Sequence, residues 1–180
     1  MKNLYIIILI LIVIFCSGFS DSIINIAVSY QPNVEKLETL FKSVLPENKG
    51  IIYTKVPRGL IISIDEKYFF NEGEARIKES SLCILDRIIM QLQALNNYCV
   101  VESHTENNNF ENSYYKADWE LSVSRSANIV EYMMKYGKLR REKLFALGYG
   151  EFMPFRDNVS IISDLDKRID FVILEYEAKR

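Results

Sequence analysis

Residues 103–106 read SHTE and residues 118–125 read DWELSVSR, and these two stretches decide how the chain folds. The first ends a β-forming run, Tyr98–Thr105, and the second opens a predicted helix that reaches about Tyr136. A polar loop over residues 107–117 joins the strand to the helix. This order sets an acid at a strand end and an arginine early in the next helix. Such a pair can bind a molecule that carries both an amine and a carboxylate.

The apolar positions of this helix predict which side faces the core. They recur at helical spacing and are expected to form a buried stripe: Val123, Ala127, Val130 and Met134. Arg125 falls about 200° from Val123 on a helical wheel, so it is expected to face a ligand or solvent. Asp118 is expected to cap the helix, and Trp119 to pack at its start.

The rest of the chain predicts a mixed sheet with helices on one face. The expected elements, in order, are strands at Ile51–Val56 and Leu60–Ile64, a helix at Glu79–Leu95, a strand at Leu144–Tyr149, a loop at Asp157–Ser163 and a strand at Arg168–Glu177. Ser80 or Ser81 is expected to cap the helix. Strands and helices alternate and two strands close the sheet, which predicts a two-layer α+β domain.

The first 20 residues have the features of an export signal. Lys2 precedes an apolar run that ends at Phe19, which is shorter than the roughly 20 residues that span a bilayer. Three interpretations stay open: a cleaved signal peptide, a retained membrane anchor, and a lipoprotein modified on Cys16. All three export the rest of the chain. Residues 21–50 are expected to form a connector with one amphipathic helix at Asn33–Val44, and residues 51–180 to form the folded domain.

Composition argues against several classes of function. The net charge is -2 and the isoelectric point is about 5.6, so the basic surface of a nucleic-acid-binding protein is missing. His104 is the only histidine and no Cys/His cluster accompanies it, so neither a metal site nor a cofactor is expected. Ser122 has no apparent triad around it, so catalysis is not expected. Cys83 and Cys99 are expected to lie too far apart for a disulfide and to be small buried residues.

Together these residues resemble the OmpA-like domain family, the peptidoglycan-binding module of Gram-negative cell envelopes. The resemblance runs from about Arg58 to Glu177. Its motifs, in order, are Arg58-Gly59-Leu60, Phe70-x-x-Gly73-x-Ala75, His104-Thr105-acid, Leu121-Ser122-x-x-Arg125, Gly148-Tyr149-Gly150-x-x-x-Pro154, Asn158 and Lys167-Arg168. The tryptophan at position 119 is most similar to the motility protein B branch.

The resemblance implies a two-layer OmpA-like sandwich and a ligand-binding site. Glu106 would face the amine, and Arg125 would pair with the carboxylate, of the diaminopimelate in a peptide stem. Asp118 takes the place of a family asparagine, and Arg168 matches the second arginine of the family's basic pair. With Thr105 from the His-Thr-acid turn, these residues are the expected contacts to peptidoglycan.

Several positions depart from the family pattern and make the expected site more acidic. The family's aspartate is Glu106 here, and two family asparagines are Asp118 and Asp166. The usual Gly-Arg upstream of the basic pair is Ile162-Ser163, and the glycine before His104 is Ser103. These changes could weaken carboxylate binding, or suit a different diamine such as ornithine.

The resemblance therefore predicts a non-catalytic protein of the periplasm or cell envelope that anchors the envelope, or a membrane complex, to peptidoglycan. The leader would attach it to the outer or inner membrane if it is retained or lipidated, and motility-branch relatives suggest a homodimer. Two alternatives stay open. The domain could have lost wall binding and contact a protein instead, or it could be a stator-associated protein of the motility protein B kind. The apolar run Leu4–Phe19 lacks the aspartate that an ion-conducting stator requires.

Overall fold

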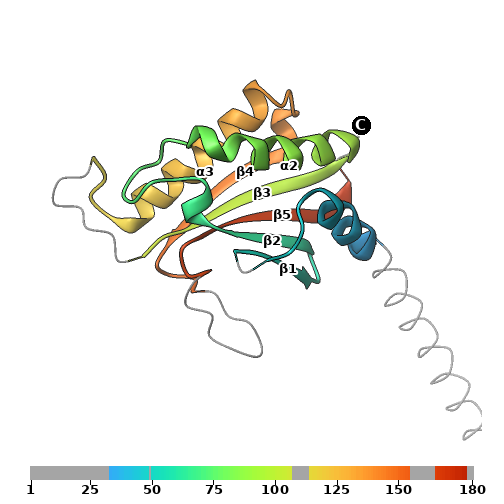
Figure 1. The fold of residues 1–180 in the computed structure, drawn as a ribbon, viewed down its shortest axis with the longest axis horizontal. Helices are drawn as coiled ribbons and strands as arrows, with labels where there is room; N and C mark the ends of the chain where they lie inside the picture. The colour runs from blue at the N-terminus through green and yellow to red at the C-terminus, as the bar shows by residue number, and fades with distance from the viewer. Residues whose placement is uncertain (1–32, 49, 107–113, 155–164, 178–180) are drawn as a thin grey trace, which may run out of the picture. The chain divides into compact units, whose positions relative to one another are not determined.

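The computed structural model describes residues 33–48, 50–106, 114–154 and 165–177 (Figure 1). The chain divides into two units, Met1–Lys36 and Leu37–Arg180, and the fold below is that of the second. The expected leader, Cys16 and the loop at 157–163 lie outside the described residues. Within those residues, no helix is both long enough and apolar enough to cross a membrane.

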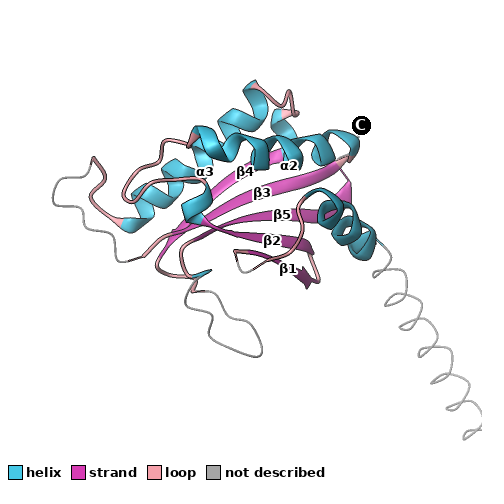
Figure 2. Ribbon diagram, viewed as in Figure 1, coloured by secondary structure: helices cyan, strands magenta, loops and turns pink. Residues whose placement is uncertain are grey.

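The second unit forms the mixed two-layer α+β fold that the sequence predicts (Figure 2). After helical residues 37–44, the elements are β1 (Ile51–Val56), β2 (Gly59–Asp65), η1 (Glu66–Tyr68), η2 (Glu79–Ser81), α2 (Leu82–Ala94), β3 (Asn97–His104), α3 (Asp118–Lys135), η3 (Arg141–Lys143), β4 (Leu144–Gly150) and β5 (Arg168–Glu177). The sheet order is β1-β2-β5-β3-β4. Only β3 and β4 run parallel, and the other neighbouring strands are antiparallel.

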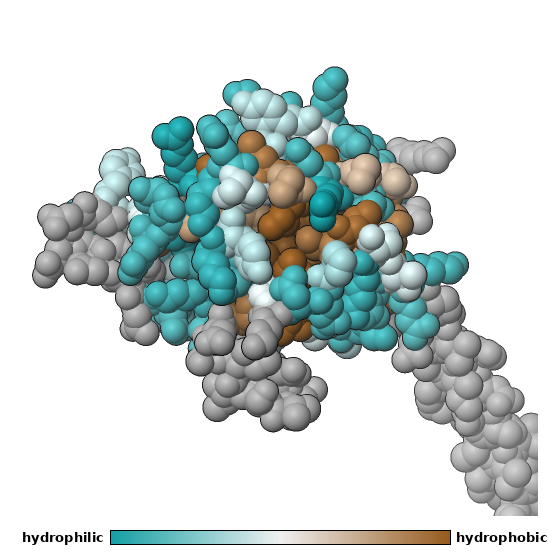
Figure 3. All heavy atoms as spheres, in the orientation of Figure 1, coloured by the Kyte–Doolittle hydropathy of each residue, from teal (hydrophilic) through white to brown (hydrophobic). Residues whose placement is uncertain are grey.

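The hydrophobic core lies between the helices and one face of the sheet. Alternate residues of β2 and β5 point toward the helices and are fully buried: Leu60, Ile62, Ile64, Ile169, Phe171 and Ile173. Phe69 packs against Phe171 with 6.0 Å between ring centroids. Helix α2 adds Leu85, Ile88, Ile89 and Leu92. In the view of Figure 3, hydrophobic residues gather near the centre and hydrophilic residues surround them.

Helix α3 is rotated relative to the prediction. Its buried residues are Leu121, Ser122, Arg125, Ser126, Ile129, Val130 and Met133. Val123 is 43% exposed, Ala127 is exposed and Met134 is half-buried, so only Val130 of the expected core stripe is fully in the core. The serines can be buried because their hydroxyls donate to carbonyls of the preceding turn, Ser122 to Trp119 and Ser126 to Val123. Small polar residues therefore form part of the face that packs on the sheet.

Further expectations, at the two helix starts and at one of the two cysteines, are also wrong. Ala117, in an extended conformation, is the N-cap of α3, so Asp118 is its first residue and stabilises the helix through its charge. Trp119 is 54% exposed rather than packed. Ser81 precedes α2, but its hydroxyl donates to the Lys78 carbonyl instead of capping. Cys99 is buried as expected, whereas Cys83 is exposed on α2.

Gly148 determines how closely α3 approaches β4. A Cβ atom at this position would lie 2.3 Å from the backbone nitrogen of Val123 and 2.6 Å from the Ser122 hydroxyl. No side chain fits into that space, so glycine lets the backbones of the helix and the strand come together. This contact sets the position of the N-terminal half of α3, which carries Asp118 and Arg125.

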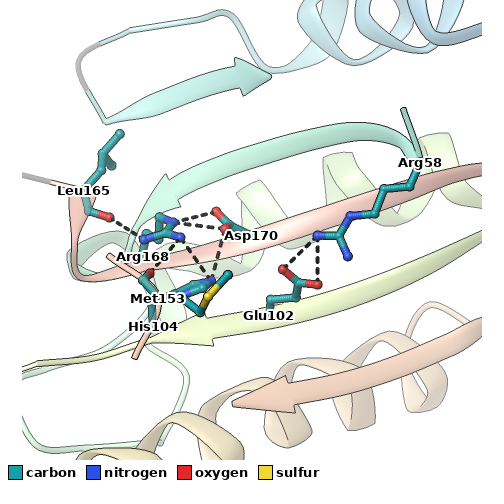
Figure 4. A network of polar contacts seen from close by, with 7 residues as sticks. All are labelled: Arg58, Glu102, His104, Met153, Leu165, Arg168 and Asp170. Atoms are coloured by element: carbon teal, nitrogen blue, oxygen red, sulfur yellow. Dashed lines mark hydrogen bonds and ion pairs between the residues drawn. The ribbon is translucent and has the colours of Figure 1, made fainter. Parts of the chain in front are cut away.

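A buried ion-pair network lies on the sheet face opposite α2 and α3 (Figure 4). The Arg168 guanidinium donates to both carboxylate oxygens of Asp170 at 3.0 and 3.2 Å, and to the carbonyls of Leu165 and Met153. His104 Nε2 lies 3.2 Å from Asp170 Oδ2 and 3.3 Å from Arg168 Nη2. Because Arg168 is 6% exposed and Asp170 4%, the two charges depend on each other for compensation.

The network should make stability depend on Asp170. Burial alone would raise the pKa of this carboxyl. The hydrogen bond from His104 and the charge of Arg168 together lower it by more, so the pKa lies below its ordinary value. Asp170→Asn leaves the buried Arg168 without its counter-charge. We expect the free energy of unfolding at pH 7, measured by urea denaturation, to fall by about 3 kcal/mol.

A control and a pH series test the same interpretation. Glu142→Gln removes the exposed ion pair with Arg140 and should change stability by less than about 0.5 kcal/mol. Because the folded pKa of Asp170 is depressed, its contribution is present above the ordinary aspartate pKa and is lost as pH falls toward the folded value. The deficit of Asp170→Asn should therefore shrink on acidification, and a constant deficit would contradict the ion-pair explanation.

Gly148→Ala should destabilise the protein by about 3 kcal/mol, because the added methyl overpacks the contact between α3 and β4. Gly73→Ala is the comparison. Gly73 has φ +67° but no atom within 4 Å of a Cβ, so the substitution costs backbone strain alone, about 1 kcal/mol. Thermal or urea unfolding of both variants measures the difference. Equal losses would show that the helix and strand can separate at little cost.

Candidate functional site

The candidate site lies at the end of the sheet where β2, β3 and β4 finish and β5 begins. The last row of paired residues across the sheet is Asp65, Arg168, His104 and Gly150. The chain leaves β2 into η1 and leaves β3 toward α3 at this same end. The structure therefore brings together segments that are far apart in the sequence, as the resemblance implies.

Thr105 joins the strand end to the start of α3. Its hydroxyl donates to the Asp118 carbonyl at 2.8 Å, and its backbone N–H donates to the Gly150 carbonyl at 3.1 Å. Thr105 is fully buried, and these bonds hold the strand end against the start of α3. Gly150 has φ +56°, and a Cβ atom there would lie 3.0 Å from the Trp119 backbone nitrogen. These contacts hold Glu106 and Asp118 at one end of the domain.

Glu106 and Asp118 are both partly exposed. Each carboxylate accepts hydrogen bonds and favours a cation, and Asp118 also lies in the first turn of α3. The exposed Trp119 follows directly. The surface of the site is therefore acidic with an aromatic residue beside it.

Arg125 is fully buried, which corrects the expectation that it faces a ligand or solvent. Its Nη1 pairs with the Glu66 carboxylate, its Nε donates to the Glu74 carbonyl at 2.8 Å, and its Nη2 donates to the Asn71 carbonyl at 3.1 Å. The guanidinium carbon lies 4.9 Å from the centre of the Phe70 ring. The charge can be buried because the segment between η1 and η2 surrounds it with acceptors.

Sequence reasoning missed Glu66, the internal partner of Arg125. It lies in the polar run Asp65-Glu66-Lys67 after β2, which has the pattern of an ordinary turn. Burial raises the pKa of the Glu66 carboxyl and the Arg125 charge opposes that rise. Burial likewise lowers the pKa of Arg125, and Glu66 opposes it. Each charge is thus tolerated in the interior because the other is present.

Glu106 and Arg125, which were expected to bind the two ends of one ligand, make no direct contact with each other. In the part of the chain that the structure describes, no hydrogen bond or ion pair joins them. The charge of Asp118 acts on Arg125 and raises its pKa slightly against the effect of burial. The structure therefore brings Thr105 and Asp118 together and separates Arg125 from solvent.

Arg168 and its neighbours are better explained as structural than as a ligand or metal site. Candidate ligand atoms of Glu102, His104 and Asp170 all lie within 4.8 Å of one another, and all three residues are buried. Arg58 pairs with Glu102 at 3.2 Å and Arg168 pairs with Asp170, so both acids already have cationic partners. A metal ion would have to displace or lie beside these arginines, and the cluster does not fit one.

Comparison with known proteins agrees with this fold. The family model described as "OmpA family" matches residues 69–166. Motility protein B of Bacillus subtilis is 30% identical over 64% of this chain and 45% of its own length. A solved putative MotB-like protein from Desulfovibrio vulgaris has a TM-score of 0.68 and 18% identity, covering 84% of this chain and 94% of that one. The cell wall anchor of the T6SS from Pseudomonas aeruginosa has a TM-score of 0.64 and 16% identity, covering 74% and 94%.

The curated relatives are longer proteins, and the chain spans less than half the length of the two that it matches, 42% and 45%. Similarity to the solved structures, at 16–18% identity, bears on the fold alone. The family model, in contrast, covers more than half of the chain and includes β3, the start of α3 and Arg125. On this match and on the mixed sheet with its helices, the chain belongs to the OmpA family.

Proposed function

We propose that this domain binds peptidoglycan without catalysis and anchors the cell envelope, or a membrane complex, to the wall. The observation that carries the proposal is that the matched family region contains the acidic end of the sheet built by Glu106 and Asp118. A cell wall anchor shares the fold, and Motility protein B is a sequence relative. The protein would work in the periplasm or cell envelope, with residues before the domain attaching it to a membrane.

The ligand feature that the site would bind is the amine of the diamino acid in a peptide stem. Glu106 and Asp118 can each accept a hydrogen bond from an ammonium, and a charge-assisted hydrogen bond contributes about 1.5–3 kcal/mol. Thr105 would position both acids through its bonds to the Asp118 and Gly150 carbonyls. Arg168 would support the same strand end through its contacts with Asp170 and His104.

A second candidate is a protein-interaction module that no longer binds the wall. The burial of Arg125 favours it, because the family's carboxylate-binding residue is not accessible. The exposure of Trp119, Phe152 and Met153, at 54%, 74% and 52%, also favours it. The sequence similarity to Motility protein B supports a stator-associated role. The described contacts of the domain give no further support for that role.

Glu106→Gln should weaken binding of the full chain to purified sacculi by about tenfold or more. The substitution keeps the size of the side chain and removes the charge that accepts the ammonium hydrogen bond. Co-sedimentation with sacculi over a range of sacculus concentrations measures the change. The matched control is Glu131→Gln, which makes the same chemical change on an exposed residue of α3, about 20 Å along the helix from Asp118.

The two candidates give different results in this assay. Sedimentation of the wild-type chain with sacculi, loss in Glu106→Gln and retention in Glu131→Gln would support wall binding at this site. Equal binding of all three would place the wall contact elsewhere. Absence of wild-type sedimentation would favour the protein-interaction module.

A further inference from the structure

We propose that the site selects peptide stems whose diamino acid ends in an amine alone, such as lysine or ornithine, over diaminopimelate, because Glu66 already occupies Arg125. The inference rests on the proposed wall binding and names the substrate class of that site. Diaminopimelate ends in an amine and a carboxylate, whereas lysine and ornithine end in an amine. The difference between these ligands is thus the carboxylate that Arg125 would have to bind.

The guanidinium of Arg125 makes its described hydrogen bonds inside the protein. Each of its three nitrogens has a partner within the protein: the Glu66 carboxylate and the carbonyls of Glu74 and Asn71. One face of its guanidinium covers the Phe70 ring. A bidentate contact to a stem carboxylate requires a free edge of the guanidinium, and a side chain with 0% exposure offers none to a ligand.

Glu66 is itself held firmly in place. Its backbone N–H donates to the Lys167 carbonyl at 3.1 Å, which ties η1 to the residue before β5. Its carbonyl accepts from the N–H groups of Phe69 and Phe70 at 2.8 and 2.9 Å. Its side chain lies in the fields of two cations, Arg125 and Lys167. Glu66 therefore supplies from within the protein the carboxylate that the ligand would otherwise bring.

The charges near the surface favour an amine without a carboxylate. An incoming carboxylate would be repelled by the partly exposed acids Glu106 and Asp118, and Glu66 already balances the charge of Arg125. Displacing Glu66 would leave a buried carboxylate without its main partner, which is unfavourable. An ammonium is attracted by the charges of Glu106 and Asp118, and it leaves the pair of Glu66 and Arg125 intact. The same arrangement of charges thus disfavours diaminopimelate and favours lysine or ornithine.

Calorimetry on the full wild-type chain tests the selection directly. Three soluble disaccharide-tripeptides serve as probes, identical except that the third residue is L-lysine, L-ornithine or meso-diaminopimelate. We expect the lysine or ornithine probe to bind at least about tenfold more tightly than the diaminopimelate probe. Equal affinities, or preference for diaminopimelate, would overturn the inference while leaving wall binding intact. Failure of all three probes would overturn wall binding itself, and the inference with it.

Two variants test whether Glu66 is the cause. Glu66→Ala removes the internal carboxylate and opens space beside Arg125, so affinity for the diaminopimelate probe should rise and the preference should fall toward equality. Since that variant leaves a buried charge less well paired and can unfold, the double variant Glu66→Gln/Arg125→Met removes both charges. When its circular dichroism matches the wild type, it should bind the lysine probe with unchanged affinity. Loss of that binding would show that Arg125 touches the ligand and would overturn the inference.

Discussion

The burial of one positive charge organises the end of the domain where the candidate site lies. A guanidinium with no solvent exposure is tolerated only when its charge and its donors have partners inside the protein. Arg125 meets that requirement through Glu66 and the carbonyls of Asn71 and Glu74. The segment between η1 and η2 contains little regular structure, so these bonds fix its path against α3. Asn128 extends the contact by donating to the Ala75 carbonyl at 2.8 Å.

A second arginine stabilises the opposite side of the same sheet end. Arg168 binds Asp170 and contacts His104, and His104 stacks on Tyr149 with 5.1 Å between ring centroids. These contacts join β5, β3 and β4 just before the chain turns into Thr105. Both arginines that the resemblance associates with the ligand are thus committed to the protein. The acids Glu106 and Asp118 at this end of the domain are partly exposed, in contrast to both arginines.

The sequence predicted the elements well and their faces less well. The bounds of β1 and β5 agree with the expected strands, since β-branched runs between turn residues are a strong local signal. The predicted buried face of α3 was wrong because the prediction counted apolar residues alone, whereas Ser122, Arg125 and Ser126 are buried. Their burial depends on contacts that are remote in sequence. Gly150 donates to the Ser122 hydroxyl from 28 positions away, and Glu66 is 59 positions from Arg125. Periodicity within a helix carries no information about such partners.

The same reasoning explains why a motif match can be correct while the role attached to it changes. A family motif such as Leu-Ser-x-x-Arg shows only that an arginine is present at a given position. The role of that arginine depends on which residue of the fold pairs with it. Here the opposite residue is Glu66, which no motif included. Once an internal carboxylate neutralises Arg125, the acidic substitutions at positions 106 and 118 change meaning as well. If Arg125 were accessible, these acids would weaken the binding of a zwitterionic ligand. Because Glu66 neutralises Arg125, the acids would instead favour a ligand that carries only a positive charge. The proposed selectivity gives the burial of Arg125 and the acidity of the surface one physical explanation: the site would need no carboxylate from its ligand.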